Sequence, residues 1–309
     1  SYSYFDIDGD AERNSEIIWA KNGAAQTALS NKTSVNTSLT AKGEKWAFSV
    51  RPFDGADFGT MQQSANTTIL NAVPLVSQIS FNNTIPKTND ELSASLTYSD
   101  PDGDVGNVTF QWFVNSSNVF NQTIRNVANG ASAMSNFSSG FFGKSDRLNV
   151  SAFAKDGEAV SLTALSATIT VANTAPSLSN PSFNNTAPKT NEDILGGAAY
   201  ADADGDKGNV TFRWYVNGTL AFTDSTAGIS NGTNAARVLL SNLFSKSDRI
   251  NFTASASDGT DSGALLASAI INAANTAPSA SSLLISPASP TSEDNLTISY
   301  SYFDIDGDA

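Results

Sequence analysis

Hydrophobic and polar residues alternate along short segments of the chain, and turn-forming residues separate these segments. Between residues 208 and 216 one face is hydrophobic and carries Val210, Phe212, Trp214 and Val216. A period of two residues is typical of a β-strand with one buried face. The same alternation recurs from Val108 to Val114, from Ile250 to Ala256 and from Trp46 to Val50. No helical period competes with it, so we predict an all-β chain.

The chain repeats itself, and this repetition predicts its domain organisation. Residues 75–176 and 177–278 align without a gap at an offset of 102 residues. The matched features are a Ser-Phe-Asn-Asn-Thr string, an acidic string, a Trp, a Lys-Ser-Asp-Arg turn and an Asn-Thr-Ala-Pro linker. They are Ser80–Thr84 with Ser182–Thr186, Asp100–Asp104 with Asp202–Asp206, Trp112 with Trp214, Lys144–Arg147 with Lys246–Arg249, and Asn173–Pro176 with Asn275–Pro278.

A third, diverged copy lies at the N-terminus and lacks its first strand. Residues 279–309 supply such a strand and end in Ser299–Ala309, which is identical to Ser1–Ala11 at an offset of 298 residues. We interpret this identity as the seam of a longer polymer with a 298-residue super-repeat. The alternative is a discrete subunit that donates residues 279–309 to its neighbour, as in donor-strand complementation. We favour continuity, because residues 299–309 would otherwise compete with the neighbour's own residues 1–11.

Each repeat contains about seven short strands, with turn signals about every 8–12 residues. A Trp on the third strand, packed between two sheets, is the immunoglobulin-like arrangement. We therefore predict tandem immunoglobulin-like β-sandwich domains in a linear array. The predicted domains are residues 1–74, which lack the first strand, 75–176, 177–278, and 279–309, which form the first strands of the next repeat.

Four short motifs carry a family resemblance: Tyr98–Asp104, a Trp-x-Val-Asn strand, the Ser257-Asp258-Gly259 turn and the Asn-Thr-Ala-Pro linker. They resemble the tandem immunoglobulin-like, cadherin-like and PKD-like β-sandwich repeats of archaeal and bacterial cell-surface and extracellular filament proteins. The resemblance covers the whole chain and implies an extracellular stalk, adhesin or filament. The calcium-binding cadherins have longer acidic linker motifs than this chain.

The composition excludes several classes of protein. The chain has no Cys and no His, so it offers no disulfide scaffold, thiol nucleophile, zinc–thiolate site or imidazole base. The net charge of −13 argues against a nucleic-acid partner. No apolar run approaches the roughly 18 residues of a membrane span, so we expect none in this segment. We also expect no enzyme, because the acidic strings recur in three repeats whereas a catalytic site is normally single.

Asn-x-Ser/Thr sequons predict N-linked glycans and hence an extracellular or cell-surface location. Along the predicted strands Asn209 and Asn217 fall on the outward face, opposite Trp214. The alternative is that a surface rich in Asn, Ser and Thr generates sequons by itself. The candidate glycosylation sites are Asn31, Asn36, Asn66, Asn82, Asn107, Asn115, Asn121, Asn136, Asn149, Asn184, Asn209, Asn217, Asn231, Asn251 and Asn295.

The Asp-x-Asp-Gly-Asp strings are the candidate metal sites. Carboxylates stand at relative positions 1, 3 and 5, as at the start of an EF-hand loop, but the Gly and the final Glu of that motif do not match. The immunoglobulin-like topology predicts that the acidic string, the later Asp-Gly turn and the incoming linker lie at one end of a domain. Such oxygen ligands suit Ca²⁺ at domain junctions. The candidate ligands are Asp6, Asp8, Asp10, Asp100, Asp102, Asp104, Asp202, Asp204, Asp206 and Asp258, with Asp261 and Asn173 expected close to the third string.

An alternative for these strings is that Asp and Gly only form tight turns, with Lys207 and Arg249 as counter-ions.

For the whole chain, we expect a structural repeat unit of a long extracellular, glycosylated filament or stalk, with other copies of the same repeat as partners. The first alternative is an adhesin shaft that recognises a surface or a glycan through aromatic residues such as Phe120, Phe141 and Phe142. A pilus-like subunit that exchanges donor strands is the less favoured alternative.

Overall fold

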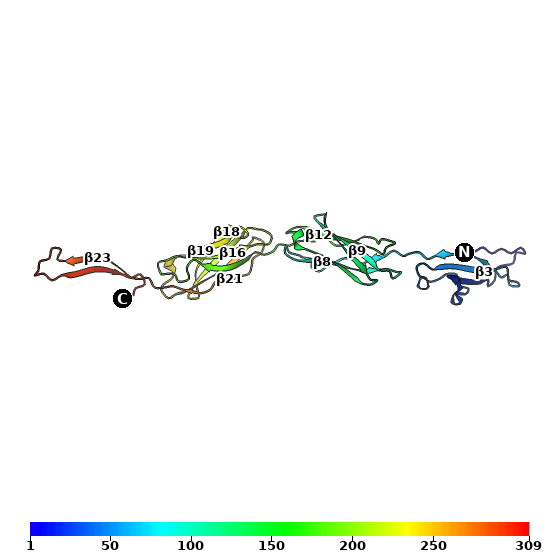
Figure 1. The fold of residues 1–309 in the computed structure, drawn as a ribbon, viewed down its shortest axis with the longest axis horizontal. Coiled ribbons are helices and arrows are strands. Elements are labelled where there is room, and N and C mark those ends of the chain that lie inside the picture. Colours follow the sequence, from blue (N-terminus) through cyan, green and yellow to red (C-terminus); the bar gives the residue numbers. More distant parts are fainter. Residues whose placement is uncertain (309) are drawn as a thin grey trace. The chain divides into compact units, whose positions relative to one another are not determined.

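The structure, a computed structural model, describes residues 1–308 and consists of short β-strands with four 3₁₀ turns (Figure 1). The chain divides into two compact units. The first unit comprises residues 1–84, 91–141 and 147–169, and the second comprises residues 85–90, 142–146 and 170 onward. The long strands of the sandwiches follow the alternation of the sequence, so one face of these strands carries buried apolar residues.

The N-terminal part of the first unit is a single antiparallel sheet in the order β2–β1–β3–β4, with β5 also on β3. Trp19 on β1 lies directly opposite Phe48 on β3. Two 3₁₀ turns, η1 (Thr27–Leu29) and η2 (Thr37–Leu39), lie between β2 and β3. The strands are β1 (Glu16–Lys21), β2 (Ala24–Ala25), β3 (Lys45–Arg51), β4 (Gln62–Gln63) and β5 (Thr67–Thr68).

The rest of the first unit is a β-sandwich. One sheet has the order β11–β8–β6, with β7 also on β8, and the other has the order β10–β9–β12–β13. Trp112 on β9 is fully buried and stacks on Phe137 of β11, with ring centroids 4.4 Å apart, so the two sheets pack face to face. The elements are β6 (Leu75–Val76), β7 (Ser80–Phe81), β8 (Leu92–Ser99), β9 (Gly106–Val114), β10 (Ser117–Val127), β11 (Ser132–Phe137), η3 (Ser139–Phe141), β12 (Arg147–Lys155) and β13 (Ala164–Leu165), followed by β14 (Ile169–Thr170).

The second unit contains another sandwich of the same kind. A three-stranded sheet β15–β16–β19 packs on the sheet β18–β17–β20–β21, with β22 also on β20. Its core surrounds Trp214 and Phe252. Phe183 of β15 packs edge-on against Phe252, with ring centroids 5.3 Å apart. The elements are β15 (Ser177–Phe183), β16 (Ile194–Ala201), β17 (Gly208–Val216), β18 (Thr219–Ile229), β19 (Asn234–Leu239), η4 (Ser241–Leu243), β20 (Arg249–Ser257), β21 (Leu266–Ala267) and β22 (Ile271–Asn272).

A separate hairpin ends the second unit. Its strands β23 (Ser279–Ser286) and β24 (Thr297–Phe303) pair with each other and form a two-stranded sheet. Every residue of both strands is exposed.

The all-β class and the tandem immunoglobulin-like sandwiches predicted from the sequence are confirmed. The faces predicted to be inward are buried in the two sandwiches: Val108, Phe110 and Trp112 are fully covered, as are their counterparts in β17. On β3, Trp46 and Val50 are buried but Phe48 is only half-buried. The domain boundaries at 74, 176 and 278 stay a prediction, although each sheet lies within one of the predicted ranges.

Candidate functional site

Each acidic string forms a tight loop after a strand of the sandwich. Asp100 follows β8, and its Oδ1 accepts hydrogen bonds from the backbone N–H of Asp102 at 2.8 Å and of Asp104 at 3.3 Å. Gly103 has a φ of 82°, which glycine adopts without strain. Asp202 builds the loop after β16 in the same way. The first Asp of each string therefore has the turn-forming role that the sequence left as an alternative.

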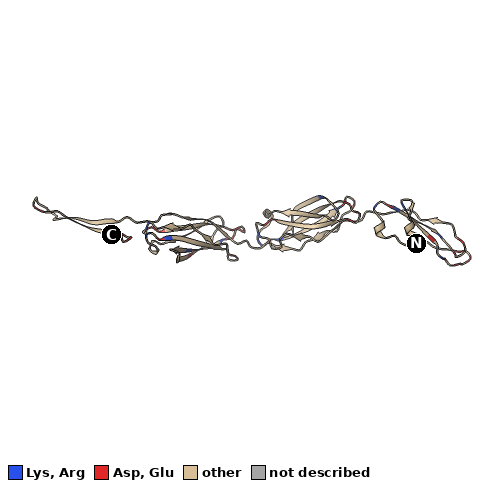
Figure 2. Ribbon diagram, turned by 90° about the horizontal axis from the view of Figure 1, so that it is seen from below, with Lys and Arg blue, Asp and Glu red and all other residues tan. Residues whose placement is uncertain are grey.

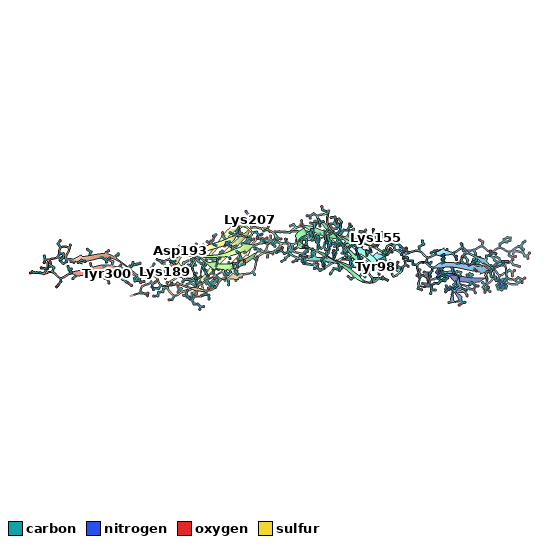
Figure 3. All side chains as sticks on the ribbon, in the orientation of Figure 1. Tyr98, Lys155, Lys189, Asp193, Lys207 and Tyr300 are labelled. Atoms are coloured by element: carbon teal, nitrogen blue, oxygen red, sulfur yellow. The ribbon has the colours of Figure 1, made fainter. Side chains whose placement is uncertain are left out.

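A buried tyrosine holds the far side of the loop. The hydroxyl of Tyr98 (labelled in Figure 3) donates to the carbonyl oxygen of Asp104 at 3.1 Å, and Tyr200 does the same for Asp206. Burial, together with nearby carboxylates, raises the pKa of both tyrosines to about 12. Gly106 lies under the Tyr98 ring, where a side chain would collide with it. The loop is thus fixed to the sandwich core.

In the first unit, the segment before β6 contacts this loop directly. The backbone N–H of Ala72 donates to Asp102 Oδ2 at 2.6 Å, and Asn71 Nδ2 donates to Asp156 Oδ2 at 2.9 Å. Lys42 Nζ lies 2.8 Å from Asp104 Oδ2 and 2.6 Å from a carboxylate oxygen of Glu158. We call this set of contacts between Lys, Asn, the linker N–H and the acidic loop the linker clasp.

The second unit contains the linker clasp once more in full and a second time with the N–H and Lys contacts but without the Asn contact. Thr174 N donates to Asp204 Oδ2 at 2.6 Å, and Lys144 Nζ lies 2.6 Å from Asp206 Oδ2. Asn173 Nδ2 donates to Asp258 Oδ2 and to an oxygen of Asp261, each at 2.8 Å.

The third clasp joins the linker to the acidic loop after β24. Thr276 N donates to Asp306 Oδ2 at 2.6 Å, and Lys246 contacts Asp308. A threonine hydroxyl adds a further contact in both clasps of this unit, from Thr88 to Asp204 and from Thr190 to Asp306. In Figure 2 the strands are mostly tan, whereas acidic and basic residues gather in the loops at the strand ends.

The charges of the clasp stabilise one another. The hydrogen bond to Asp206 raises the pKa of Lys144, and the hydrogen bonds to Asp104 and Glu158 raise the pKa of Lys42. Burial alone would raise the pKa of Asp258, but the hydrogen bonds from Asn173 and from two backbone N–H groups lower it below its ordinary value. The Asp258 carboxylate, whose pKa is lowered, is therefore charged near neutral pH.

Some oxygen atoms at the clasp have no hydrogen-bond partner although they are buried. In the first unit they are Asp100 Oδ2 and Asn71 Oδ1, and in the second unit Asp202 Oδ2 and Asn173 Oδ1. Asp100 and Asp202 are each only 3% exposed. The three carboxylates of each string approach within 4.8 Å of one another at Asp100–Asp104, at Asp202–Asp206 and at Asp304–Asp308. These are hard oxygen donors, so the site fits a hard cation such as Ca²⁺.

The structure does not bring all the predicted ligands together. Asp6 builds the same turn as Asp100, but Asp6, Asp8 and Asp10 are not among the carboxylate clusters of residues 1–308. Asp258 lies beside the linker, bound to Asn173, and is not part of the cluster of its own repeat.

The candidate glycosylation sites lie at the surface. None of the fifteen sequon asparagines is buried; Asn107, Asn149 and Asn251 are half-buried and the others are exposed. Several of them hold the backbone through Oδ1, as Asn184 does with Leu195 N at 2.8 Å. A glycan is attached at Nδ2, so such hydrogen bonds are compatible with modification. Asn82 and Asn217 are different, because their Nδ2 atoms donate to Glu91 and Asp248.

Sequence reasoning missed the lysines of the clasp. Under the tight-turn alternative Lys207 and Arg249 are the counter-ions, but the ion pairs of the acidic loops are made by Lys42, Lys144 and Lys246. Each is 62 residues before its aspartate. The signal was present, because these three lysines recur at an offset of 102 residues, the period of the repeat.

Comparisons with known proteins add little. No family model matches the chain, and no curated protein matches it. Among solved structures, the chain is similar to the FN1–FN3 domains of chicken CNTN1, with 10% identity over 87% of this chain and 91% of that chain, and a TM-score of 0.28. A TM-score this low supports no inference. In residues 1–308 no helix is long and apolar enough to cross a membrane.

Proposed function

We propose that the chain is a structural repeat unit of a long extracellular, glycosylated filament or stalk, with no catalytic role. The observation that carries this proposal is the recurrence of the linker clasp. The same backbone N–H and lysine contacts, with the same sequence separations, fasten a linker to the acidic loop of the following repeat three times, and the Asn contact accompanies two of them. A protein that contacts only a ligand has no need to repeat such a joint, whereas tandem repeats gain stability from each neighbour contact.

Ca²⁺ is the proposed cofactor of the joint. Asp100 and Asn71 in the first unit, and Asp202 and Asn173 in the second, would supply the oxygen atoms that have no other partner. The ion would neutralise the closely spaced carboxylates and tie the linker to the loop. The clasp lysines supply positive charge at the same place, so they compete with the ion for the last Asp of each string.

N-linked glycans at the exposed sequons are the proposed modification. They would cover polar strand surface and hinder edge-to-edge pairing with other proteins. Glycopeptide mass spectrometry of the native protein tests this directly, and unmodified asparagine at all fifteen sequons would contradict it.

The test of the structural role has two parts. Electron microscopy of the native particle should show a uniform fibre with a constant axial repeat; a compact globule would overturn the proposal. Within one molecule, the Thr174 N–H should be protected from hydrogen exchange because it donates to Asp204. Lys144→Ala should weaken the clasp and reduce that protection, whereas the matched variant Lys207→Ala, beside Asp206 in sequence, should not.

An adhesin shaft is the second candidate function. The aromatic residues expected to form a recognition patch are largely occupied: Phe142 is buried, and Phe141, which is 45% exposed, stacks on Phe137 at 5.2 Å. Phe120 packs on the same Phe137 ring at 6.1 Å. These contacts favour a packing role for the three residues, so the structural role remains our first proposal.

A further inference from the structure

The C-terminal hairpin has an apolar face that nothing in its own repeat covers. Leu296, Ile298, Tyr300 and Tyr302 alternate along β24 and the segment before it, and all four are more than half exposed (Tyr300 is labelled in Figure 3). β23 and β24 form a sheet of only two strands. A hairpin on its own is at best marginally stable in water, so this face requires a partner.

The complete repeats show what such a hairpin packs against. At an offset of 102 residues, the four hairpin residues correspond to Ile194, Gly196, Ala198 and Tyr200 of β16, all buried. Gly196, the equivalent of Ile298, faces Trp214 and Phe252 of the opposite sheet. A Cβ on Gly196 would lie 2.6 Å from the Trp214 ring and 2.8 Å from the Phe252 ring. The partner of the hairpin must therefore present an aromatic pair of this kind.

The first repeat along the chain, residues 1–74, lacks the strand that would cover its aromatic pair. Trp19 is paired with Phe48 across β1 and β3, as Trp214 is paired with Phe252 across β17 and β20. Yet Trp19 and Phe48 are only half-buried, and with Trp46 and Val35 they line an open hollow of about 390 Å³. No strand of residues 1–74 occupies the place that β16 takes in the repeat of residues 177–278, the third along the chain.

Side-chain sizes are matched between the two surfaces. The hairpin carries the larger Ile298 where the third repeat has Gly196. In compensation, it has Ile285 in place of Phe183, and the first repeat has Ile17 in place of Phe212. The side-chain volume added at one position is thus removed at neighbouring positions. Cores tolerate several substitutions together when their total volume is kept.

We infer that β23–β24 of one copy docks on the open first repeat of a second copy and completes its sandwich. The register follows from the third repeat, where Ile194 lies opposite Leu239 and Gly196 opposite Arg237. The equivalent turns η2 and η4 lie 204 residues apart. At that offset Leu239 corresponds to Val35, and Arg237 corresponds to Thr33. Leu296 of one copy therefore pairs with Val35 of the next, and Ile298 with Thr33, in an antiparallel ladder.

The inference rests on the proposed function and deepens it by naming the partner surface. It does not depend on whether the two copies are separate chains or successive periods of one chain. Residues 1–11 and 299–309 are identical, so both segments fit the same strand position of the sandwich, but residues 279–298 have no duplicate. The contact between Ile298 and Thr33 therefore reports on the docking in either case.

Engineered disulfides test the register, since the chain has no Cys to interfere. Residues directly opposite across an antiparallel pair have Cβ atoms about 4.5–5.5 Å apart, close to disulfide geometry. In one arm, the 309-residue chains Thr33→Cys and Ile298→Cys are mixed under mild oxidation and examined on a non-reducing gel. In the other, a chain of two periods, residues 1–298 followed by 1–309, carries Ile298→Cys in its first period and Thr33→Cys in its second.

The control replaces Ile298→Cys by Thr297→Cys. A shift of one residue along a strand turns the side chain to the opposite face, so this variant should cross-link at least tenfold less. Cross-linking in both arms supports docking between separate chains, and cross-linking only in the two-period chain supports docking between successive periods. No cross-link in either arm, or equal cross-linking by the control, overturns the inference. Thr174 protection is unaffected by all three substitutions, so the proposed function can stand if this inference falls.

Discussion

Replacing Gly106 by Ala tests how tightly the acidic loop is built into the sandwich. A Cβ at this position would lie 2.5 Å from two carbon atoms of the Tyr98 ring, whereas carbon atoms in contact are normally about 3.5–4.0 Å apart. The Tyr98 ring is fully buried, so it has no free space to move into. Forcing such an overlap in a packed core costs about 1–3 kcal/mol. The hydrogen bond from Tyr98 to Asp104, which holds the loop, would be displaced as well.

Hydrogen exchange of β8 and β9 measures this loss locally, without requiring the whole chain to unfold in one step. A cost of about 1–3 kcal/mol corresponds to roughly 5- to 150-fold faster exchange, because about 1.4 kcal/mol is a factor of ten. Gly140→Ala is the matched control, since a Cβ there meets nothing within 4 Å and its φ is not in the left-handed region. If Gly106→Ala exchanges no faster than Gly140→Ala, the packing argument is wrong. Gly208→Ala should reproduce the effect under Tyr200.

Three further predictions concern single groups. Ser135→Ala removes the buried partner of the Trp112 indole N–H, which it accepts at 2.9 Å; the free energy of unfolding measured in urea should fall by about 1–3 kcal/mol, and an unchanged midpoint would contradict this. The pKa values of Tyr98 and Tyr200 are raised to about 12, so their contribution to stability is complete below about pH 10 and is lost as the pH rises to about 12; alkaline unfolding followed by tyrosinate absorbance checks the window. Added CaCl₂ should raise the melting temperature of the full chain, and both a chelator and Asp202→Asn should cancel that rise; a melting temperature insensitive to all three would remove the proposed ion.

The sandwiches could be predicted because their longest strands are amphipathic. β9 and β17 each run for nine residues with a buried residue at nearly every second position, so the two-residue period is repeated several times. The two-residue strands could not be predicted. β13 and β21 are too short to show any period, and they form because hydrogen bonds from β12 and β20 fix them at the edge of a sheet.

The candidate site was predicted only as far as local sequence reaches. The three aspartates of each string lie within five residues, so the loop follows from the string itself. The neighbourhood of Asn173, Asp258 and Asp204 followed from the topology of an immunoglobulin-like fold. Lys144 belongs to the preceding repeat, and its approach to Asp206 depends on how the linker leaves one sandwich. Nothing local in the sequence encodes that geometry, and only the regular recurrence of the lysine hints at it.

The linker clasp is built from polar and charged groups. Each of its ion pairs is partly exposed, and an exposed ion pair contributes little by itself. In a single domain such a contact would hardly matter. In an array of repeats each domain contacts mainly its neighbours, so stability is a sum of equal terms, one for each junction. In the repeat array that we propose, a clasp that recurs at every junction would stabilise the whole array although each single clasp is weak.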